Sequence, residues 1–241
     1  MGLLKGKKAL ITGALGTIGQ TLLKRFAEEG ASVIAADRPD AEGTLTADVR
    51  YFGCDLGDLA ETERAANALA DEVGGIDILI NNAATVVNKA NEAFSIAEYE
   101  EEIRVNSSAA FVLSRALSRH MKERKQGKIV CMTSLTLTGH WEGFVPYIAS
   151  KGAMLGLIKG LSRELGHHGI NVNGISPGAV VSDAEWRHFG ERREAYHNWV
   201  LERQCLKRRI EPVDIANLAV FLSSAQADLI TGENIRCDGG W

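Results

Sequence analysis

The chain has 241 residues, of which 45% are hydrophobic and 24% charged, and its formal net charge is −4. This composition is ordinary for a soluble globular protein, and the acidic balance argues against nucleic acid as a partner. No run approaches the roughly 18 apolar residues of a membrane helix or forms a secretory signal, so we expect a cytoplasmic protein with no membrane partner.

Short apolar runs rich in Val and Ile alternate with helical patterns along the chain. Such near-continuous runs suit parallel strands that are covered on both faces, and the helical patterns suit the crossovers between them. No Pro/Gly/Ser-rich linker and no internal repeat interrupts the alternation. The sequence therefore predicts one α/β domain, a doubly wound parallel sheet with helices on both faces. The runs are residues 9–11, 32–36, 51–54, 76–80, 128–132 and 170–175.

A glycine turn, from Thr12 to Gly19, follows the first run and opens the first helical pattern. Gly13, Gly16 and Gly19 allow a tight turn and a close approach of backbone to a pyrophosphate, and the helix N-terminus adds partial positive charge. Any strand-to-helix turn that needs small residues is the structural alternative. The position of the turn between a strand and a helix favours a dinucleotide site.

Asp37 closes the second run, where a carboxylate can accept hydrogen bonds from both adenosine ribose hydroxyls. The same carboxylate would repel a 2′-phosphate, and the glycine turn holds no Lys or Arg, so the pattern favours NAD over NADP. Arg38 keeps NADP open, because a guanidinium can receive a phosphate. An Asp at a strand end can also simply form a turn.

Two later helices carry further predictions. Residues 95–98 match a capping box, so a long helix is expected to begin there and run towards His120. A second helix begins near Pro146 and continues through Leu161, and its apolar residues cover more than one stripe. We expect one side of this helix to face the sheet and the other to face another subunit, which makes the protein a homo-oligomer, a dimer or a tetramer.

Tyr147 and Lys151 are four residues apart on this second helix, so their side chains share a face. A nearby ammonium favours the phenolate and lowers a Tyr pKa that is ordinarily about 10. A phenol tuned in this way can exchange protons near neutral pH. The pair, downstream of a dinucleotide turn, predicts an enzyme.

The four cysteines form no CxxC pair, and no HExxH motif or histidine at metal-ligand spacing accompanies them. Cys54 and Cys131 fall at the ends of apolar runs, where buried thiols behave as small hydrophobes. We therefore expect reduced thiols and no metal site.

The motifs of this chain, in their order along the sequence, resemble those of the short-chain dehydrogenase/reductase family, and the resemblance covers essentially the whole length. The resemblance implies a single Rossmann-like domain over residues 1–241, with about seven strands and a substrate lid near 183–209. The chain departs from the family pattern at Thr17, Ala84 and Ser182, and none of these departures removes a reactive group. The matching motifs are the glycine turn, Cys54-Asp55-Leu56, Asn81-Asn82-Ala83-Ala84, Asn106, Ser134, Tyr147 with Lys151, Pro177-Gly178 and the ending 230–240.

The resemblance implies cofactor contacts position by position. Asp55 would bond the adenine amino group, and Leu56 would line its pocket; a local helix cap is the structural alternative for Asp55. Asn82 and Ala83 would pass close to the adenosine ribose. Lys151 would bridge the nicotinamide ribose hydroxyls, and Ser182 would hold the carboxamide. The other implied positions are Gly13, Leu15, Gly16, Thr17, Ile18, Gly19, Asp37, Ala84, Tyr147, Pro177, Gly178 and Val180.

The implied catalytic residues are Asn106, Ser134, Tyr147 and Lys151. Tyr147, as phenolate, would take a proton from a substrate hydroxyl while hydride leaves the same carbon for NAD. Ser134 would donate a hydrogen bond to the substrate oxygen. Asn106 has poor helix propensity, and a local break there would free a carbonyl for a water that relays protons from Lys151. The alternative for Asn106 is a solvated position on the helix surface.

Substrate contacts are expected from Ser134, Tyr147, His140 and Trp141, and from Trp186 in the lid. The polarity near His140 favours a hydroxylated or sugar-like small molecule over an aliphatic or steroid one. Most lid charges suit the solvated faces of two amphipathic helices. A sharper hypothesis has one or two Arg or His side chains of the lid binding a carboxylate, a phosphate or a polyol.

The sequence thus predicts an NAD-dependent oxidoreductase that acts on a secondary alcohol or ketone. An NADP(H)-dependent carbonyl or 3-oxoacyl reductase is the alternative among enzymes, and Asp37 disfavours it. A non-catalytic NAD-binding regulatory protein is the alternative from another class. The presence of Ser134, Tyr147, Lys151 and Asn106 together argues against a pure binder, which needs no tuned phenol.

Overall fold

The computed structural model describes residues 2–40, 45 and 49–241, and these form a seven-stranded parallel sheet in the order β3-β2-β1-β4-β5-β6-β7. The predicted doubly wound sheet is confirmed. The chain moves outward from β1 to β3 and then returns to β4 on the other side of β1, so the order reverses between β1 and β4. In such sheets ligands bind at this reversal, outside the carboxyl ends of the strands. The strands are β1 (Lys8–Thr12), β2 (Ser32–Asp37), β3 (Arg50–Gly53), β4 (Ile78–Asn81), β5 (Gly127–Met132), β6 (Ile170–Pro177) and β7 (Asn234–Cys237).

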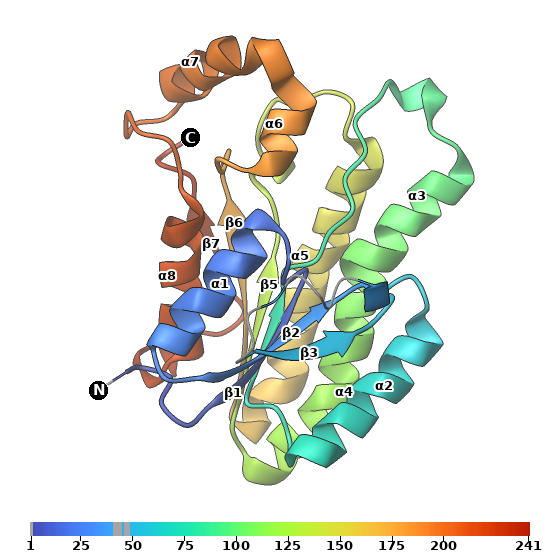
Figure 1. The fold of residues 1–241 in the computed structure, drawn as a ribbon, viewed down its shortest axis with the longest axis vertical. Helices are drawn as coiled ribbons and strands as arrows, with labels where there is room; N and C mark the ends of the chain where they lie inside the picture. The colour runs from blue at the N-terminus through green and yellow to red at the C-terminus, as the bar shows by residue number, and fades with distance from the viewer. Residues whose placement is uncertain (1, 41–44, 46–48) are drawn as a thin grey trace.

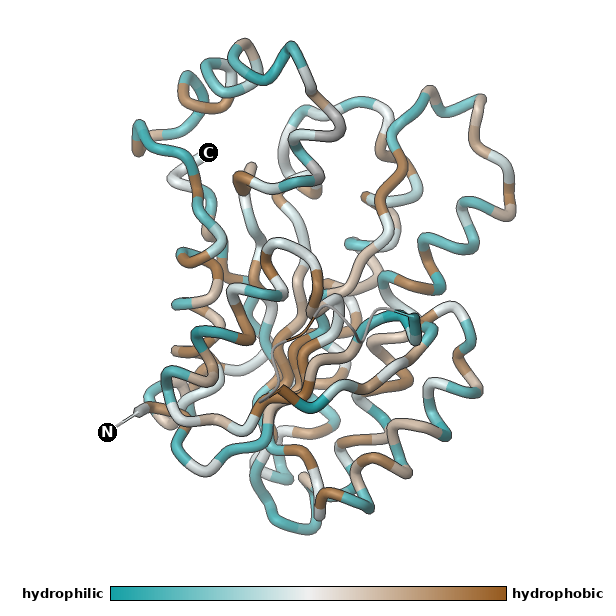
Figure 2. Tube along the Cα trace, in the orientation of Figure 1, coloured by the Kyte–Doolittle hydropathy of each residue, from teal (hydrophilic) through white to brown (hydrophobic). Residues whose placement is uncertain are grey.

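Helices cover both faces of the sheet (Figure 1). On one face lie α1 (Thr17–Glu28) and α8 (Pro212–Ser223), and on the other lie α2 (Leu59–Val73), α4 (Ala109–Arg124) and α5 (Val145–Leu165). Successive residues of a strand pack into opposite helix layers. In β1, Ile11 packs with α1 and α8, whereas Leu10 packs with α2 and α4. This double burial explains the continuous apolar runs, which form the brown centre of Figure 2.

The capping box predicted at residues 95–98 is present. The Ser95 hydroxyl accepts from the Glu98 N–H at 3.3 Å, and the Glu98 carboxylate accepts from the Ser95 N–H at 2.8 Å. The helix that begins there does run beyond His120, but in three parts: α3 (Ile96–Ile103), a π-helical segment η3 (Arg104–Ser108), and α4. The interruption contains Asn106, at the position where the sequence predicts a local break.

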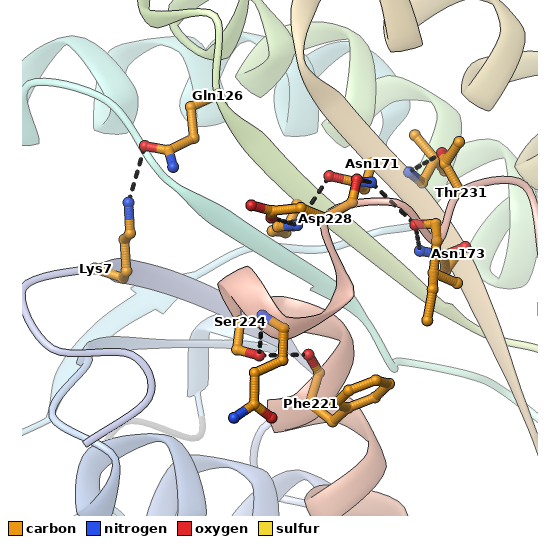
Figure 3. A network of polar contacts seen from close by, with 12 residues as sticks. Lys7, Gln126, Asn171, Asn173, Phe221, Ser224, Asp228 and Thr231 are labelled. Carbon is orange, nitrogen blue, oxygen red and sulfur yellow. Dashed lines mark hydrogen bonds and ion pairs between the residues drawn. The ribbon is translucent and has the colours of Figure 1, made fainter. Parts of the chain in front are cut away.

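A polar network anchors β6 and β7 at their amino ends (Figure 3). Asn171 donates to the carbonyls of Asp228 at 2.9 Å and Ile230 at 3.0 Å, and Asn173 also donates to Ile230, at 2.7 Å. The buried ammonium of Lys128, on β5, donates to the Asn171 and Asp228 side chains at 2.9 and 2.6 Å. These bonds fix β5, β6 and the chain before β7 to one another at the end of the sheet opposite the carboxyl ends.

That segment, predicted as a lid, folds into α6 (Asp183–Phe189) and α7 (Arg193–Arg203) above the carboxyl ends of the strands (Figure 1). β6 ends at Pro177 and the first of these helices begins at Asp183, which contacts Thr17 at the start of α1. Within the described part of the chain, none of the helices is both long enough and apolar enough to span a bilayer. The remaining short helical turns are η2 (Asn91–Ala93), η4 (Leu135–Leu137), η5 (Gly166–His168), η6 (Gly190–Arg192) and η7 (Ala225–Ala227).

Candidate active site

The glycine turn lies at the reversal of strand order, between β1 and α1. Gly13 has φ +61°, and a Cβ there would lie 2.8 Å from the Ala83 Cα at the end of β4. A Cβ on Gly19 would lie 2.0 Å from the Gly13 carbonyl oxygen, so α1 can approach the turn only with glycine there. At Gly16 the nearest atom would be 3.5 Å away, an ordinary contact. The fold therefore requires Gly13 and Gly19, whereas Gly16 keeps the open side of the turn clear.

The N-terminus of α1 has the properties of an anion site. Gly16 precedes the helix without capping it by a side chain, and the first turn contains no acidic residue. Its N–H groups therefore retain their partial positive charge. Thr17, the first helical residue, exchanges two hydrogen bonds of 3.3 Å with Asp183 at the start of the lid. Ile18 packs inward against the apolar layer of α1 and α8.

Asp37 ties the end of β2 to this turn. Its two carboxylate oxygens accept from the Leu15 N–H and from the Arg38 N–H, each at 2.9 Å. The side chain thus has a structural role that its position in the sequence did not reveal. Each oxygen retains a further lone pair, so these bonds leave room for hydroxyl donors. The Arg38 side chain is exposed beside it.

The residues after β3 form a turn at the adjacent strand end. Asp55 accepts from the Gly57 N–H at 2.9 Å, whereas Asp58 is the residue that caps α2, accepting from the Glu61 N–H at 3.0 Å. The predicted alternative of a helix cap at Asp55 is therefore wrong. Leu56 is half-buried and packs against the apolar layer of α2 and α4.

Thr12 joins β1 to β4 in the same region. Its hydroxyl accepts from the Asn82 and Ala83 N–H groups, both at 3.0 Å, and the Asn82 side chain donates to the carbonyls of Thr12 at 2.9 Å and Gly13 at 3.1 Å. The sequence pattern assigned no role to Thr12, because a threonine that ends a strand carries no local signal of its partners. Ala84, the next residue, is exposed.

Tyr147 and Lys151 face each other on the first turns of α5. The Lys151 Nζ atom is 5.4 Å from the centre of the Tyr147 ring and donates to the Met132 carbonyl at the end of β5, at 2.7 Å. The lysine side chain is 2% exposed. The Tyr147 side chain is hydrogen-bonded to Ser134, which also lies just after β5. The shared helical face predicted for the pair is present.

The pKa values of this pair differ from the sequence-based expectation. Burial raises the pKa of Tyr147 to about 12, and the nearby Glu102 charge adds to this while the hydrogen bond from Ser134 opposes it. Burial also lowers the pKa of Lys151 to about 8. The expected lowering of the Tyr147 pKa is therefore wrong for the chain's own groups, because the loss of water around the phenolate is the largest effect on it.

Asn106 lies inside the π-helical segment and is 1% exposed, which excludes the alternative of a solvated surface position. Its side chain accepts from the Thr85 N–H at 2.7 Å and donates to the Thr85 carbonyl at 2.9 Å and the Ser150 hydroxyl at 3.0 Å. Ser150 in turn donates to the Tyr147 carbonyl at 2.7 Å. Asn106 thus links the segment after β4 to the helix turn that carries Tyr147.

Ser134 and Tyr147 open into a cavity of about 300 Å³ beneath the lid. Ser182 lines it and caps α6 by accepting from the Glu185 N–H at 3.2 Å. Aromatic side chains form much of the wall, and Trp141 and Tyr196 are hydrogen-bonded to each other. The other lining residues are Val86, Asn88, Leu135, Thr136, Phe144, Pro177, Gly178, Ala179, Val180, Glu185 and Phe189.

Three of the five expected substrate residues, Ser134, Trp141 and Tyr147, line this cavity. His140 is exposed, Trp186 is 54% exposed, and neither is among the lining residues. Glu185 is a lining residue that the sequence did not indicate, because most lid charges suit solvated helix faces whereas this one is buried. A weak signal existed, because Ser182 and Glu185 have the spacing of a capping box.

A protein-family model described as enoyl-(acyl carrier protein) reductase matches residues 13–241. Gluconate 5-dehydrogenase of Gluconobacter oxydans is 34% identical, over 98% of this chain and 95% of the relative. D-threitol dehydrogenase of Mycolicibacterium smegmatis is 35% identical, over 99% of this chain and 94% of the relative. The structure of a gluconate 5-dehydrogenase from Burkholderia cenocepacia in complex with NADP and tartrate has a TM-score of 0.89 at 30% identity, covering 98% of this chain and 95% of that one.

Substitution of Gly16 and Gly19 by alanine separates the needs of the fold from those of a ligand. Gly19→Ala is expected to lower the free energy of unfolding by at least about 1–3 kcal/mol, because its Cβ overlaps the Gly13 carbonyl. Gly16→Ala should cost less than about 1 kcal/mol but weaken dinucleotide binding at least about tenfold, since its methyl group enters the open side of the turn. Denaturant unfolding and a binding titration measure the two effects. If Gly16→Ala bound the dinucleotide as tightly as the unaltered protein, the assignment of the dinucleotide to the open side of this turn would be contradicted.

Proposed function

This chain belongs to the short-chain dehydrogenase/reductase family, and on that premise we propose that it is an NAD-dependent oxidoreductase for a secondary alcohol, or its ketone, that carries further hydroxyl groups. The observation that carries the proposal is the convergence of the Tyr147 phenol and the Ser134 hydroxyl on one cavity, with the Lys151 ammonium behind the phenol. Relatives named for gluconate and D-threitol support a polar, hydroxylated substrate.

The described residues fit a nicotinamide dinucleotide. The uncapped N-terminus of α1 and the open side of Gly16 would receive the pyrophosphate, and Asp37 would accept from the adenosine ribose. Asp55 and Leu56 would hold the adenine, and Lys151 would bind the hydroxyl groups of the nicotinamide ribose. Asn82, Ala83, Pro177, Gly178, Val180 and Ser182 would complete the site, as the family resemblance implies. When bound, the oxidised nicotinamide supplies a hydride acceptor and a positive charge beside the phenol.

Tyr147 is the group that moves the proton in this proposal. Oxidation requires its Oη atom to be deprotonated so that it can accept the proton of the substrate hydroxyl, and reduction requires it to be protonated. Ser134 donates to the substrate oxygen and favours the charge that develops there. Lys151 offsets part of the cost of a buried phenolate, because a positive charge near the ring favours the ionised form.

Asn106 acts on the same chemistry by positioning. Its bonds to Thr85 and Ser150 tie the π-helical segment to the chain after β4 and to the turn of α5 that contains Tyr147. We propose that a carbonyl released by this segment binds a water that connects Lys151 to solvent. Glycine or a longer side chain at this position would lose the paired bonds to Thr85 that support the arrangement.

Tyr147→Phe is expected to lower kcat about 10²–10⁴-fold while dinucleotide binding is retained, because only the proton carrier is removed. In the unaltered protein, kcat/KM for oxidation should rise with pH, since burial raises the pKa of Tyr147 and the phenol must first lose its proton. The reductive rate should fall over the same pH range. Residual activity in the variant should lose this dependence. Substantial turnover with an unchanged pH profile would show that the acid/base lies elsewhere.

The preference for NAD over NADP rests on Asp37. A 2′-phosphate would meet its carboxylate, although the exposed Arg38 and the NADP in the similar Burkholderia structure favour the alternative. We expect kcat/KM to be more than about tenfold higher with NAD, a difference of about 1.4 kcal/mol. Asp37→Asn should reduce that ratio by removing the repulsion. A preference for NADP in the unaltered protein would overturn the NAD assignment and leave the oxidoreductase assignment standing.

We also propose that the chain is a homo-oligomer in the cytoplasm, with α5 at the contact between subunits. The outer side of this helix exposes several small residues, Gly152, Ala153, Gly156 and Gly160, which would allow close approach of a second copy. Phe111, on neighbouring α4, is exposed as well. Sedimentation or light scattering should give the mass of a dimer or a tetramer. A monomeric mass would refute this assembly.

A further inference from the structure

Glu185 is the one formally charged residue among the described side chains that line the cavity. Neither lysine, arginine nor histidine is among those lining residues; Lys151 lies behind the phenol rather than in the wall. Among the described side chains, a carboxylate on a substrate would therefore meet the Glu185 carboxylate and neutral donors only. The described lining thus contains none of the lid arginines or histidines expected to bind an anion, and the side chains of Arg187 and His188 lie outside the described residues.

The side chain of Glu185 is buried and held from one side only. It is 8% exposed, and its Oε2 atom forms an ion pair with the Arg209 guanidinium, which also donates to the Ala179 carbonyl at 3.2 Å. This pairing cancels the positive charge of Arg209 close to the cavity. The guanidinium lies over the Tyr196 ring, 5.6 Å from its centre, so the pair is fixed against the aromatic wall.

The second carboxylate oxygen of Glu185 has no protein partner. Oε1 is buried, and no hydrogen bond reaches it from any described residue. Buried polar atoms are rarely left without a partner, because the loss of water costs free energy that only a new hydrogen bond regains. The residue could have closed a capping box on Ser182, but only the Ser182 half of that motif forms. The carboxylate is instead turned to Arg209 at the cavity wall.

Aromatic residues line the same cavity as this acceptor, among them Trp141, Phe189 and Tyr196. Phe189 stacks on Tyr196 with ring centres 3.7 Å apart, and Trp141 packs against Trp199 and Trp241 at 5.4 and 4.7 Å. A wall of this kind matches the apolar C–H faces of a polyol, while a buried carboxylate oxygen accepts from its hydroxyl groups. A volume of about 300 Å³ is at the lower end for ligand pockets, which favours a small molecule over an acyl chain on a carrier protein.

We propose that Glu185 contacts the substrate and determines specificity, its Oε1 atom accepting a hydrogen bond from a hydroxyl group remote from the reacting carbon. The enzyme accordingly takes neutral polyols or sugars and discriminates against sugar acids. The inference rests on the proposed oxidoreductase function and names the substrate class of that site. The expected discrimination follows because an anion loses the hydrogen bond to Glu185 and gains repulsion from it.

The test compares C4–C6 alditols, such as D-threitol, with the aldonates of the same carbon skeleton, each assayed with NAD and with NADP. We expect kcat/KM to favour the alditol of each pair. Glu185→Gln keeps the shape of the side chain but removes its negative charge, so the positive charge of Arg209 is no longer neutralised. The alditol-to-aldonate ratio of kcat/KM should therefore fall about 10–100-fold. Glu194→Gln, an exposed carboxylate on α7, is the matched control and should leave the ratio unchanged.

A second variant separates the effect on specificity from a loss of lid structure, which removal of one buried charge alone could cause. Glu185→Leu combined with Arg209→Met removes both buried charges together, which buried pairs tolerate better than the loss of one partner. Its alditol-to-aldonate ratio should also fall, at a melting temperature close to that of the unaltered protein. A purely structural ion pair would instead lower kcat/KM for all substrates equally and leave the ratio unchanged, which would overturn the inference.

The failure of this inference and that of the proposed function are distinguishable. If kcat/KM of the unaltered protein were higher for aldonates than for alditols, the proposed role of Glu185 would be wrong, while the oxidoreductase assignment would stand. An absence of turnover with every alditol, aldonate and corresponding ketone, with either dinucleotide, would remove the proposed function itself. Quenching of tryptophan fluorescence by alditols, but not by aldonates, gives a binding readout that is independent of turnover, because Trp141 lines the cavity.

Discussion

The buried contact between Lys151, Tyr147 and the end of β5 is the constraint on which the rest of the site depends. Lys151 donates to the Met132 carbonyl, so α5 is held against the strand that also presents Ser134. The price of this arrangement is the desolvation of two ionisable groups, which raises the pKa of Tyr147 and lowers that of Lys151. In the proposed reaction, the positive charge of an oxidised nicotinamide beside this phenol would favour release of its proton. Burial would then make proton transfer depend on occupancy of the site.

The carboxyl ends of β1, β2 and β4 are joined by side chains that act on backbone. Thr12 and Asn82 connect β1 to β4, and Asp37 connects β2 to the glycine turn. Asn106 does the same for the segment after β4. These residues set the shape of the crevice before any ligand enters it, so a residue in this region can be needed both for the fold and for binding. Asp37 is the clearest case, because the carboxylate proposed to bind ribose also supports the turn.

The sequence predicted elements far better than contacts across the cavity. The apolar runs predicted the strands because each strand is covered on two faces, and the motif at residues 95–98 predicted a helix start that needs only local bonds. The break near Asn106 was also expected from its poor helix propensity. In contrast, His140 and Trp186, which are expected at the substrate, lie outside the lining, and Glu185 is buried in a lid whose charges are expected to be mostly solvated. The pKa of Tyr147 was expected to fall, and burial raises it instead.

By itself, the sequence determined the alternation of strands and helices, the glycine turn at the end of the first strand, and the shared face of Tyr147 and Lys151. All three depend on neighbours within a few residues or on the side-chain period of one element. Only the tertiary structure decided which groups lose water and which charges meet. Glu185 and Arg209 belong to different segments, and their pairing and burial arise when the lid folds over the strand ends. Desolvation is a property of everything packed around a group, so no local pattern reveals it.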